Sequence, residues 1–417
     1  MSNHPASGEK VILVHVDFPA GPMQEDLAEF CELANSAGAK IATIITTKKR
    51  APEAKYFIGS GKAEEIRDAV IAHQAKLVIF NHSLSPAQER NLNNLLRCRV
   101  LDRVGLILDI FAQRARSFEG QLQVELALLK HLSTRLIRGW THLERQRGGI
   151  GLRGPGETQL EVDRRIIRTK MKTINQRLAK IRKQREQSRR ARQKAVIPTV
   201  ALVGYTNAGK STLFNLLTGA NVYAANQLFA TLDPTLRRIT SPQVGPIILA
   251  DTVGFIRHLP PDLIAAFHAT LEEVSKADLL LHLVDIHDEN KLFHAEQVNI
   301  VLQQLHADHI PQLMVYNKID LYPELSPIAH TPIEKAVKKV FISATKNIGI
   351  EELTIAIGSL LNCNMVEKTL VLRPKEAALR AKLYQLGKVI AEQIDEQGNA
   401  HLTVRLPVHE MEKLRKQ

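Results

Sequence analysis

The chain has 417 residues, of which 44% are hydrophobic and 24% charged, and a formal net charge of +13, so we expect about two to four domains with buried cores. Its three cysteines, Cys31, Cys98 and Cys363, have neither metal-ligand spacing nor the pattern of a disulfide framework, which fits a reducing cytoplasm. No segment approaches the ~18 uninterrupted apolar residues of a membrane span, and Met1–Lys10 lacks the pattern of a signal peptide. We therefore expect a cytoplasmic protein without a membrane span.

The first part of the chain, residues 1–105, alternates short apolar runs with helical stretches. This alternation predicts a small domain with a parallel sheet covered by helices. The expected strands are Val11–Asp17, Ala42–Thr46 and Leu77–Asn81, and the expected helices are Gln24–Ala37, Lys62–Ala75 and Pro86–Arg97. His73 and His82 lack metal-ligand spacing, so solvated or structural histidines are expected. Binding of an adenine nucleotide by this domain stays open, although no loop demands it.

Residues 106–197 are strongly basic, with 22 Lys and Arg against 8 Asp and Glu, whereas residues 198–363 hold 11 against 16. Such segregation is expected of a surface that meets a phosphate backbone or another acidic partner. Two helices are predicted here, Ser117–Ile137 and Glu157–Lys194, and they would form an antiparallel hairpin. The apolar residues at helical spacing are Leu122, Leu126, Leu129, Leu132 and Leu136 in the first helix, and Leu160, Ile167, Met171, Ile174, Leu178 and Ile181 in the second.

The loop of this hairpin, residues 145–156, places arginines among glycines. Glycine lets the backbone approach a phosphate or a base, and arginine supplies fork-shaped donors. The expected contacts to RNA are Arg145, Arg147 and Arg153 in the loop, and Arg182, Arg189 and Arg190 at the basic end of the second helix. A flexible turn and a solvated helix face are the alternatives.

The most specific motif is a phosphate-binding loop of the form G-x-x-x-x-G-K-[ST], which lies between the apolar run Thr199–Val203 and the amphipathic stretch Thr212–Leu217. Its glycines let successive N–H groups face phosphate oxygens, and the following helix offers its positive end. Lys210 would pair with the β- and γ-phosphates, and the Ser211 hydroxyl would bind Mg²⁺. The loop and the first helical residues are Gly204, Tyr205, Thr206, Asn207, Ala208, Gly209, Lys210, Ser211 and Thr212.

Two segments after this loop match nucleotide-sensing switches. In the first, Phe229-Ala230-Thr231-Leu232-Asp233, the Thr231 hydroxyl would complete the magnesium shell, with Thr235 as a rival for that role. The second, Asp251-Thr252-Val253-Gly254, follows the strand-like run 247–250. Asp251 would hold the magnesium ion, and the Gly254 N–H would bond the γ-phosphate. Lys210, Thr231 and Gly254 are therefore the expected catalytic residues, and ordinary loop chemistry is the alternative for both segments.

The next motif, Asn317-Lys318-Ile319-Asp320, follows the apolar run 313–316 and so lies at the carboxyl end of a strand, where open α/β sheets bind ligands. The Asp320 carboxylate would accept hydrogen bonds from the N1–H and exocyclic amine of guanine, a donor pair that adenine lacks. Lys318 would lie over the base, and Asn317 would tie this loop to the phosphate loop. A backbone N–H of Ser343-Ala344-Thr345, after the run 339–342, would meet guanine O6. The sequence therefore predicts a guanine nucleotide.

The tail is expected to form a small α+β domain, residues 364–417, with strands at Lys368–Leu372 and His401–Leu406 and a helix over Lys375–Gln393. The fold class is therefore α/β: a P-loop domain at 198–363 with a doubly wound, mostly parallel sheet, preceded by an α/β domain and a basic antiparallel hairpin. Without an exposed heptad pattern beyond the hairpin, a monomer is the default.

The motifs together resemble the translation-factor-related class of GTPases. The string Gly148–Arg165, with the phosphate loop downstream, closely resembles the HflX family, and the likeness covers essentially the whole chain. The resemblance implies binding of GTP or GDP with Mg²⁺, binding to the large (50S) ribosomal subunit and its rRNA, and splitting of stalled ribosomes under stress. Phe255 stands where Ras-like members carry a water-orienting glutamine. This implies slow intrinsic hydrolysis that a partner accelerates.

Two other functions stay open. The same switch would also suit a regulator of another RNA or of ribosome assembly. A phosphotransferase built on the same loop would leave the motifs at Asn317–Asp320 and Asp251–Gly254 unexplained, which argues against it.

Overall fold

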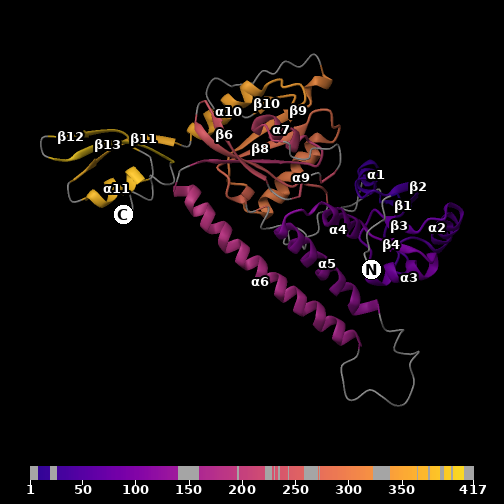
Figure 1. Cartoon of the computed structure of the whole chain (residues 1–417). Coiled ribbons are helices and arrows are strands. Elements are labelled where there is room, and N and C mark those ends of the chain that lie inside the picture. Colours follow the sequence, from indigo (N-terminus) through magenta and orange to yellow (C-terminus); the bar gives the residue numbers. More distant parts are fainter. Residues whose placement is uncertain are drawn as a thin grey trace. The chain divides into compact units, whose positions relative to one another are not determined.

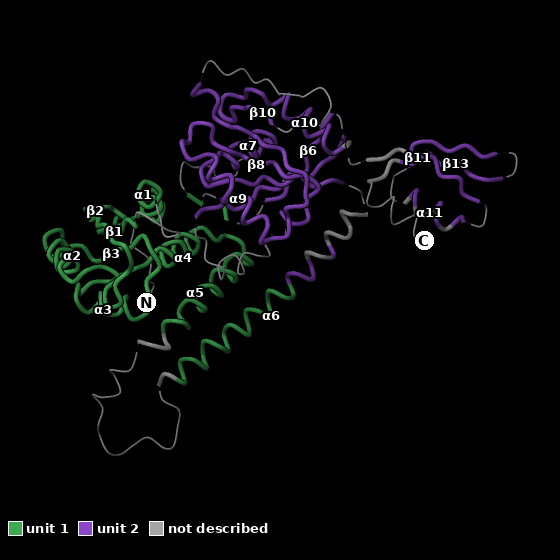
Figure 2. The backbone as a smooth tube through the Cα atoms, turned by 180° about the vertical axis from the view of Figure 1, so that it is seen from behind, with its two compact units in different colours: residues 1–180, 225–233, 258–268 green, residues 181–224, 234–257, 269–417 purple. Residues whose placement is uncertain are grey.

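The computed structural model describes residues 8–18, 26–139, 159–194, 197–220, 228–229, 231–232, 235–242, 244–257, 271, 273–322, 339–363, 365–373, 376–385, 389–395 and 398–407. They belong to two compact units (Figure 2). Unit 1 comprises residues 1–180, 225–233 and 258–268, and unit 2 comprises residues 181–224, 234–257 and 269–417.

Unit 1 is built on a parallel sheet of four strands in the order β2-β1-β3-β4. The two inner strands are continuous apolar runs because helices cover both faces, and Val11, Ile12, Leu13 and Val14 have no exposed surface. The strands are β1 Lys10–Asp17, β2 Lys40–Lys48, β3 Leu77–Phe80 and β4 Arg99–Leu101. The helices are α1 Leu27–Ser36, α2 Ser60–His73, α3 Pro86–Leu96 and α4 Arg103–Arg114 (Figure 1).

The polar groups at the carboxyl ends of β1 and β3 bond to one another. The Asn81 amide nitrogen lies 3.0 Å from Nδ1 of His15, and Arg103 donates to the Asn81 amide oxygen at 2.9 Å. Arg103 also forms a buried ion pair with Glu29. His82 is buried with its ring against Phe18, at a centroid distance of 5.2 Å, so it is a structural histidine, as the sequence suggests.

Two long helices follow, α5 Phe118–Gly139 and α6 Gln159–Lys194, and they lie side by side as an antiparallel pair (Figures 1 and 2). Ile174 and Leu178 of α6 are buried, as the heptad pattern predicts, whereas Leu132 of α5 is 40% exposed. Arg135 of α5 donates to Glu89 at 2.6 Å and to Asp102 at 2.7 Å, which joins α5 to α3 and to the start of α4. The loop with Arg145, Arg147 and Arg153 lies outside the described residues.

Unit 2 contains a sheet of six strands in the order β10-β9-β8-β5-β7-β6, parallel except for β6, which is antiparallel to β7. Its core is formed by the apolar residues of the central strands and of the helices packed on them. The strands are β5 Thr199–Gly204, β6 Thr235–Ser241, β7 Gly245–Asp251, β8 Leu279–Asp285, β9 Gln312–Asn317 and β10 Lys339–Phe341. The helices are α7 Lys210–Thr218, α9 Lys291–Gln304, α10 Ile350–Cys363 and the short η2 Ile319–Leu321.

The tail forms an antiparallel sheet, β11 Met365–Leu372, β13 Ala400–Pro407 and β12 Val389–Ile394, with helix α11 Ala377–Gln385 beside it. The predicted helix over Lys375–Gln393 is wrong at its end: α11 ends at Gln385, and residues 389–393 belong to strand β12. Pairing with β13 and the β-branched residues Val389 and Ile390 outweigh the helical pattern there. In the part of the chain that the structure describes, every helix is too short or too polar to span a bilayer.

The sequence does not predict β4 and α4, because a strand of three residues carries almost no periodic signal. The start of α4 is fixed by Asp102, whose carboxylate accepts the Gly105 N–H at 2.8 Å. Helix α4 runs through the junction 105–106, where the sequence places a domain limit.

Asp109 on α4 is a buried carboxyl group, and burial raises its pKa to about 7, with Arg99 opposing the shift. The folded state therefore holds the proton more tightly than the unfolded state, and its stability falls as the pH rises from about 4 to about 7. We expect Asp109→Asn to remove this dependence and to raise the free energy of unfolding of unit 1 at pH 8 by up to about 4 kcal/mol. Urea titration of the full chain with pulsed hydrogen exchange of residues 103–114 measures it. Glu64→Gln on the exposed face of α2 is the control, and equal pH profiles of Asp109→Asn and wild type would contradict the assignment.

Candidate functional site

The predicted phosphate loop joins β5 to α7 at the carboxyl edge of the six-stranded sheet. Two of its glycines have backbone conformations that side chains rarely adopt, with φ of 151° at Gly204 and 92° at Gly209. A Cβ atom would lie 2.4 Å from the Leu283 carbonyl oxygen at Gly204, and 2.2 Å from the Asn317 amide nitrogen at Gly209. Both positions therefore require glycine, and the loop is packed directly against β8 and the end of β9.

Lys210 begins α7 and is buried at the centre of this loop. Its ammonium group donates to the carbonyl oxygens of Gly204 at 3.0 Å and Tyr205 at 2.7 Å. Burial lowers the pKa of Lys210 to about 8, while the nearby Asp251 carboxylate opposes the shift. The cation is therefore held inside the loop, where phosphate oxygens would approach it.

The two groups predicted to hold magnesium meet at the end of β7. The Ser211 hydroxyl donates to the Asp251 carboxylate at 2.9 Å, and Asp251 has no exposed surface. A hydroxyl and a carboxylate are oxygen ligands of the kind that Mg²⁺ prefers, so this pair fits the ion. Thr252, the next residue, donates to the Leu202 carbonyl oxygen at 2.5 Å and fixes the direction of the chain.

The second switch lies against the phosphate loop. The Thr206 N–H donates to the Phe255 carbonyl oxygen at 2.8 Å, and the Phe255 N–H donates to the Gly204 carbonyl oxygen at 3.2 Å. A Cβ atom on Gly254 would lie 2.8 Å from the Thr206 side chain and 3.2 Å from Nζ of Lys210. The Gly254 backbone is therefore adjacent to the lysine that would bind the γ-phosphate. The Phe255 ring is buried, so this residue packs locally.

The motif Asn317–Asp320, predicted to bind the base, is joined to the phosphate loop through Asn317 at the end of β9. Its side chain donates to the Ala208 carbonyl oxygen at 2.9 Å and accepts the Ala344 N–H at 3.0 Å. The Ser343 hydroxyl donates to Asp320 at 2.6 Å and lies 3.1 Å from the Thr345 hydroxyl. The structure thus brings Asn317, Asp320 and the 343–345 loop to one place, and Ile319 of the same motif is buried.

Several residues of this region are absent from the sequence predictions. Asp285 ends β8 and pairs with Lys318 at 2.6 Å. Its position at the carboxyl end of a buried strand, between two strands that are predicted to carry site residues, is the feature of the sequence that indicates a site residue. Arg257 and His294 contact Tyr205, and no sequence pattern marks that contact.

The first switch has its described residues in unit 1. The Leu228 N–H donates to the Ser36 hydroxyl at 3.1 Å, and the Phe229 ring meets the Phe111 ring edge-on at a centroid distance of 4.6 Å. Phe229 has a φ of 55° and is buried, so packing holds it in a conformation unusual for a bulky residue. Thr231 is also buried, while Ala230 and Asp233 lie outside the described residues.

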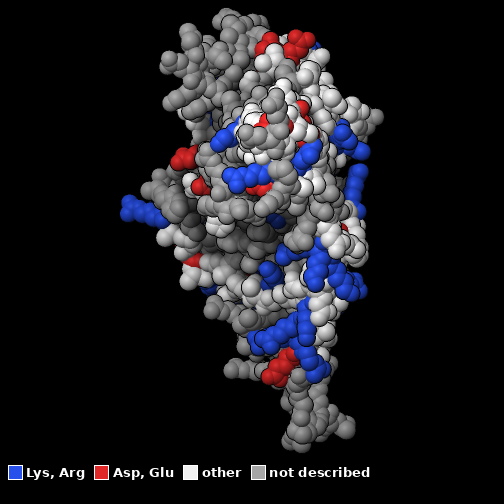
Figure 3. All heavy atoms as spheres, turned by 90° about the vertical axis from the view of Figure 1, so that its left-hand side faces the viewer, with Lys and Arg blue, Asp and Glu red and all other residues white. Residues whose placement is uncertain are grey.

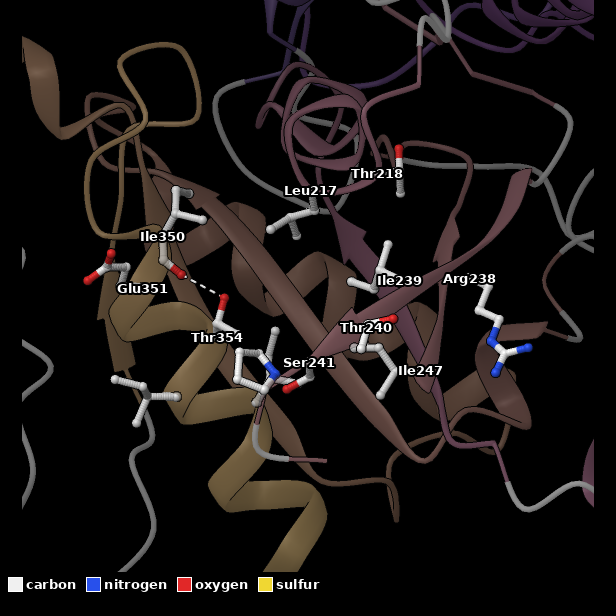
Figure 4. A pocket seen from close by; sticks show the side chains of 13 residues that line it. Leu217, Thr218, Arg238, Ile239, Thr240, Ser241, Ile247, Ile350, Glu351 and Thr354 are labelled. Carbon is white, nitrogen blue, oxygen red and sulfur yellow. Dashed lines mark hydrogen bonds between the residues drawn. The ribbon is translucent and has the colours of Figure 1, made fainter. Parts of the chain in front are cut away.

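A cavity of about 690 Å³ opens elsewhere in unit 2, between the end of α7, strands β6 and β7, and α10 (Figure 4). Leu217, Ile239 and Ile350 point into it, and Arg238 and Glu351 lie at its margins. None of the residues that line it belongs to the predicted nucleotide-binding motifs. The cavity is therefore distinct from the site at the carboxyl ends of the parallel strands.

The site is spread over loops that follow β5, β7, β9 and β10, all at the carboxyl edge of one doubly wound sheet. A glycine loop around a buried lysine, joined through Asn317 to a second motif at the end of the neighbouring β9, defines a P-loop GTPase. Family models match along the chain: "GTP-binding GTPase N-terminal" at residues 24–112, "GTP-binding GTPase Middle Region" at 114–192, and "50S ribosome-binding GTPase" at 199–318.

The chain is 55% identical over 411 residues to the GTPase HflX of Escherichia coli, covering 99% of this chain and 96% of that protein. It is 47% identical over 391 residues to the GTPase HflX of Caldanaerobacter subterraneus, covering 94% and 89%. A solved structure of SsGBP in complex with GDP is 26% identical and covers 84% of this chain and 98% of that chain, with a TM-score of 0.48. The chain belongs to the HflX family of GTPases.

Replacing Asp320 by asparagine tests the reading of the base. We expect Asp320→Asn to lower the affinity for GDP by roughly 10- to 100-fold, because guanine would face an amide in place of the carboxylate that accepts its two donors. The affinity for ADP should not change. Isothermal calorimetry of the wild type and Asp320→Asn with GDP and ADP measures the preference for guanine. Asp308→Asn on the exposed surface of the same unit is the matched control. An unchanged ratio of GDP to ADP affinity would remove Asp320 from the base site.

The contact of the first switch with α4, both in unit 1, is tested by truncating Phe111. We expect Phe111→Ala to speed hydrogen exchange of residues 228–232 by about tenfold, because the Phe229 ring loses the partner that holds its turn. Mass spectrometry of the full chain measures the exchange. Phe30→Ala removes an equally buried ring from α1 in the same unit. If both variants speed exchange alike, general loosening explains the effect.

Proposed function

We propose that this GTPase is a nucleotide-switched factor of the cytoplasm that binds the large ribosomal subunit and splits stalled ribosomes under stress. The proposal is supported by the family model for a "50S ribosome-binding GTPase" over residues 199–318 and by the basic character of the preceding helices. The observation that carries it is the exposed row of basic residues on α6, in the same chain as a built nucleotide site.

In this proposal the nucleotide is held from both ends. The residues of the phosphate loop, 204–212, bind the phosphates, while 317–320 and 343–345 bind guanine. Ser211, Thr231 and Asp251 hold Mg²⁺, which neutralises charge on the phosphate oxygens when it is bound. The Ser211–Asp251 hydrogen bond supports two of these three assignments, because it brings two suitable oxygen ligands together beside Lys210.

Intrinsic hydrolysis is proposed to be slow. The residue after Gly254 is Phe255, whose ring is buried and whose main chain is bonded to the phosphate loop. A buried phenyl ring has no polar atom to orient the attacking water, so a partner must order the site or supply the missing group. We propose that this partner is the large subunit.

The basic surface of α6 supports an RNA partner. Between residues 161 and 183 of α6 the acidic side chains are Glu161 and Asp163, and the other charged side chains are Lys and Arg. On the face of the molecule drawn in Figure 3, Lys and Arg are more frequent than Asp and Glu. A row of exposed cations is expected to follow a phosphate backbone and to release counterions on binding. The exposed basic residues of α6 are Arg165, Arg168, Lys170, Lys172, Arg177, Lys180, Arg182 and Lys183. Arg189 and Arg190 continue the same helix.

A second function shares this surface. Contacts to phosphate carry no information about which RNA is bound, so the same α6 surface would also serve a regulator of another RNA or of ribosome assembly. Co-sedimentation with purified large subunits in GTP, GDP and nucleotide-free states separates the two functions.

Replacing the loop arginines tests the proposed partner. We expect purified large subunits to accelerate GTP turnover of the wild type, and Arg147→Ala with Arg153→Ala to lower that acceleration by about tenfold or more, since two phosphate or base contacts are lost. Turnover without subunits should stay unchanged, because none of the proposed nucleotide-binding residues belongs to this loop. A steady-state phosphate-release assay measures both rates.

The matched control is Lys368→Ala with Arg373→Ala, which removes two exposed cations from the C-terminal part of the chain. Rapid turnover of the isolated wild type, unaffected by subunits, would refute slow intrinsic hydrolysis. Equal sedimentation in all nucleotide states would refute the switch.

A further inference from the structure

We propose that Tyr205 and His294 are positioning residues for the second switch: they fix the end of the Gly254–Arg257 segment and thereby the N–H that meets the γ-phosphate. The inference rests on the proposed role of Gly254 in the nucleotide site. Tyr205 occupies an unrestricted position of the phosphate-loop motif, so the motif alone gives its side chain no task.

The Tyr205 side chain connects two other segments of unit 2. Its hydroxyl accepts the N–H of Arg257, three residues after the end of the second switch, at 2.9 Å. Its ring stacks on the imidazole of His294, with centroids 4.0 Å apart and planes 14° from parallel. One side chain of the phosphate loop thus joins the second switch to the first turn of α9.

His294 is itself held in place. Its Nδ1 lies 2.5 Å from the Asp288 carboxylate, in the loop between β8 and α9. The neighbouring Phe293 ring lies under the Arg257 guanidinium, 4.6 Å from its centroid. Arg257 is therefore fixed twice, at its backbone by Tyr205 and at its side chain by α9.

The same loop also reaches the base-reading motif. It begins at Asp285, which pairs with Lys318 at 2.6 Å. Contacts therefore run from Lys318 through Asp285 and the 285–294 segment to Tyr205 and Arg257. Filling of the base site and order in the second switch would then support each other through packed side chains.

The main-chain bonds between Phe255 and the phosphate loop hold the Gly254–Arg257 segment next to Gly254, and Tyr205 holds the far end of the segment at Arg257. Gly254 lies between Lys210 and these anchors, in a space that has no room for a Cβ atom. An N–H that is already aimed loses little conformational freedom when the γ-phosphate arrives. GDP has no γ-phosphate, so its binding does not depend on the orientation of the Gly254 N–H.

Calorimetry of the full chain with Mg²⁺, using GDP and a non-hydrolysable GTP analogue, tests the proposal. We expect Tyr205→Phe, which keeps the ring and removes the hydroxyl, to weaken binding of the analogue by about 3- to 10-fold while the affinity for GDP stays within about twofold. His294→Ala should act in the same direction, and His294→Phe should restore the stack and most of the affinity. Single-turnover hydrolysis should slow in parallel with the loss of analogue affinity.

Tyr384→Phe is the matched control, since it removes a hydroxyl that donates to Glu392 in the C-terminal sheet. Equal losses of affinity for GDP and for the analogue would show a merely structural role and overturn the proposal. The proposal would also be overturned if neither Tyr205→Phe nor His294→Ala lowered the affinity for the analogue. A wild type that binds ATP as well as GTP would instead refute the proposed guanine site, so the two failures are distinguishable.

Discussion

The side-chain amide of Asn317 is the contact on which the geometry of the site depends. It bonds the carbonyl of Ala208 in the phosphate loop and the N–H of Ala344 in the loop that follows β10. Its nitrogen also occupies the space that a Cβ on Gly209 would need. One neutral side chain therefore sets the separation between the region that would bind phosphates and the region that would bind the base. Because both amide atoms are bonded, the group has little freedom to rotate.

The rest of the site follows from parallel pairing. Strands β5, β7, β8, β9 and β10 run in the same direction, so their last residues gather at one edge of the sheet. Gly204, Asp251 and Asp285 each end a strand whose preceding residues are largely buried, and Asn317 ends β9, where buried and half-buried residues alternate. Apolar burial thus holds the strands in place, while the polar residues at their ends are free to differ in chemistry.

Much of this architecture is predictable because buried parallel strands read as short continuous apolar runs. The runs before Gly204, Asp251 and Asn317 place the motifs at the sheet edge without a structure. Strand β4 is too short to produce a pattern, and strand β12 is set by pairing with β13 and so was mistaken for helix. The stack of Tyr205 on His294 and the ring contact of Phe229 with Phe111 join residues far apart in the chain, and no periodicity records such pairs. Arg145, Arg147 and Arg153 stay predictions from composition and resemblance.

The ring contact between Phe111 and Phe229 also limits how the chain can be divided. Residues 225–233 come from the middle of the GTPase sequence, yet they are part of the compact unit formed by the N-terminal residues. A fragment that starts at Pro198 would leave the Leu228 and Phe229 side chains facing water, and a fragment that stops at Ile197 would uncover Phe111. Each cut exposes an aromatic side chain that is buried in the intact chain, and the resulting apolar patch favours aggregation. Neither half, expressed alone, would be a faithful replica of its counterpart in the intact polypeptide.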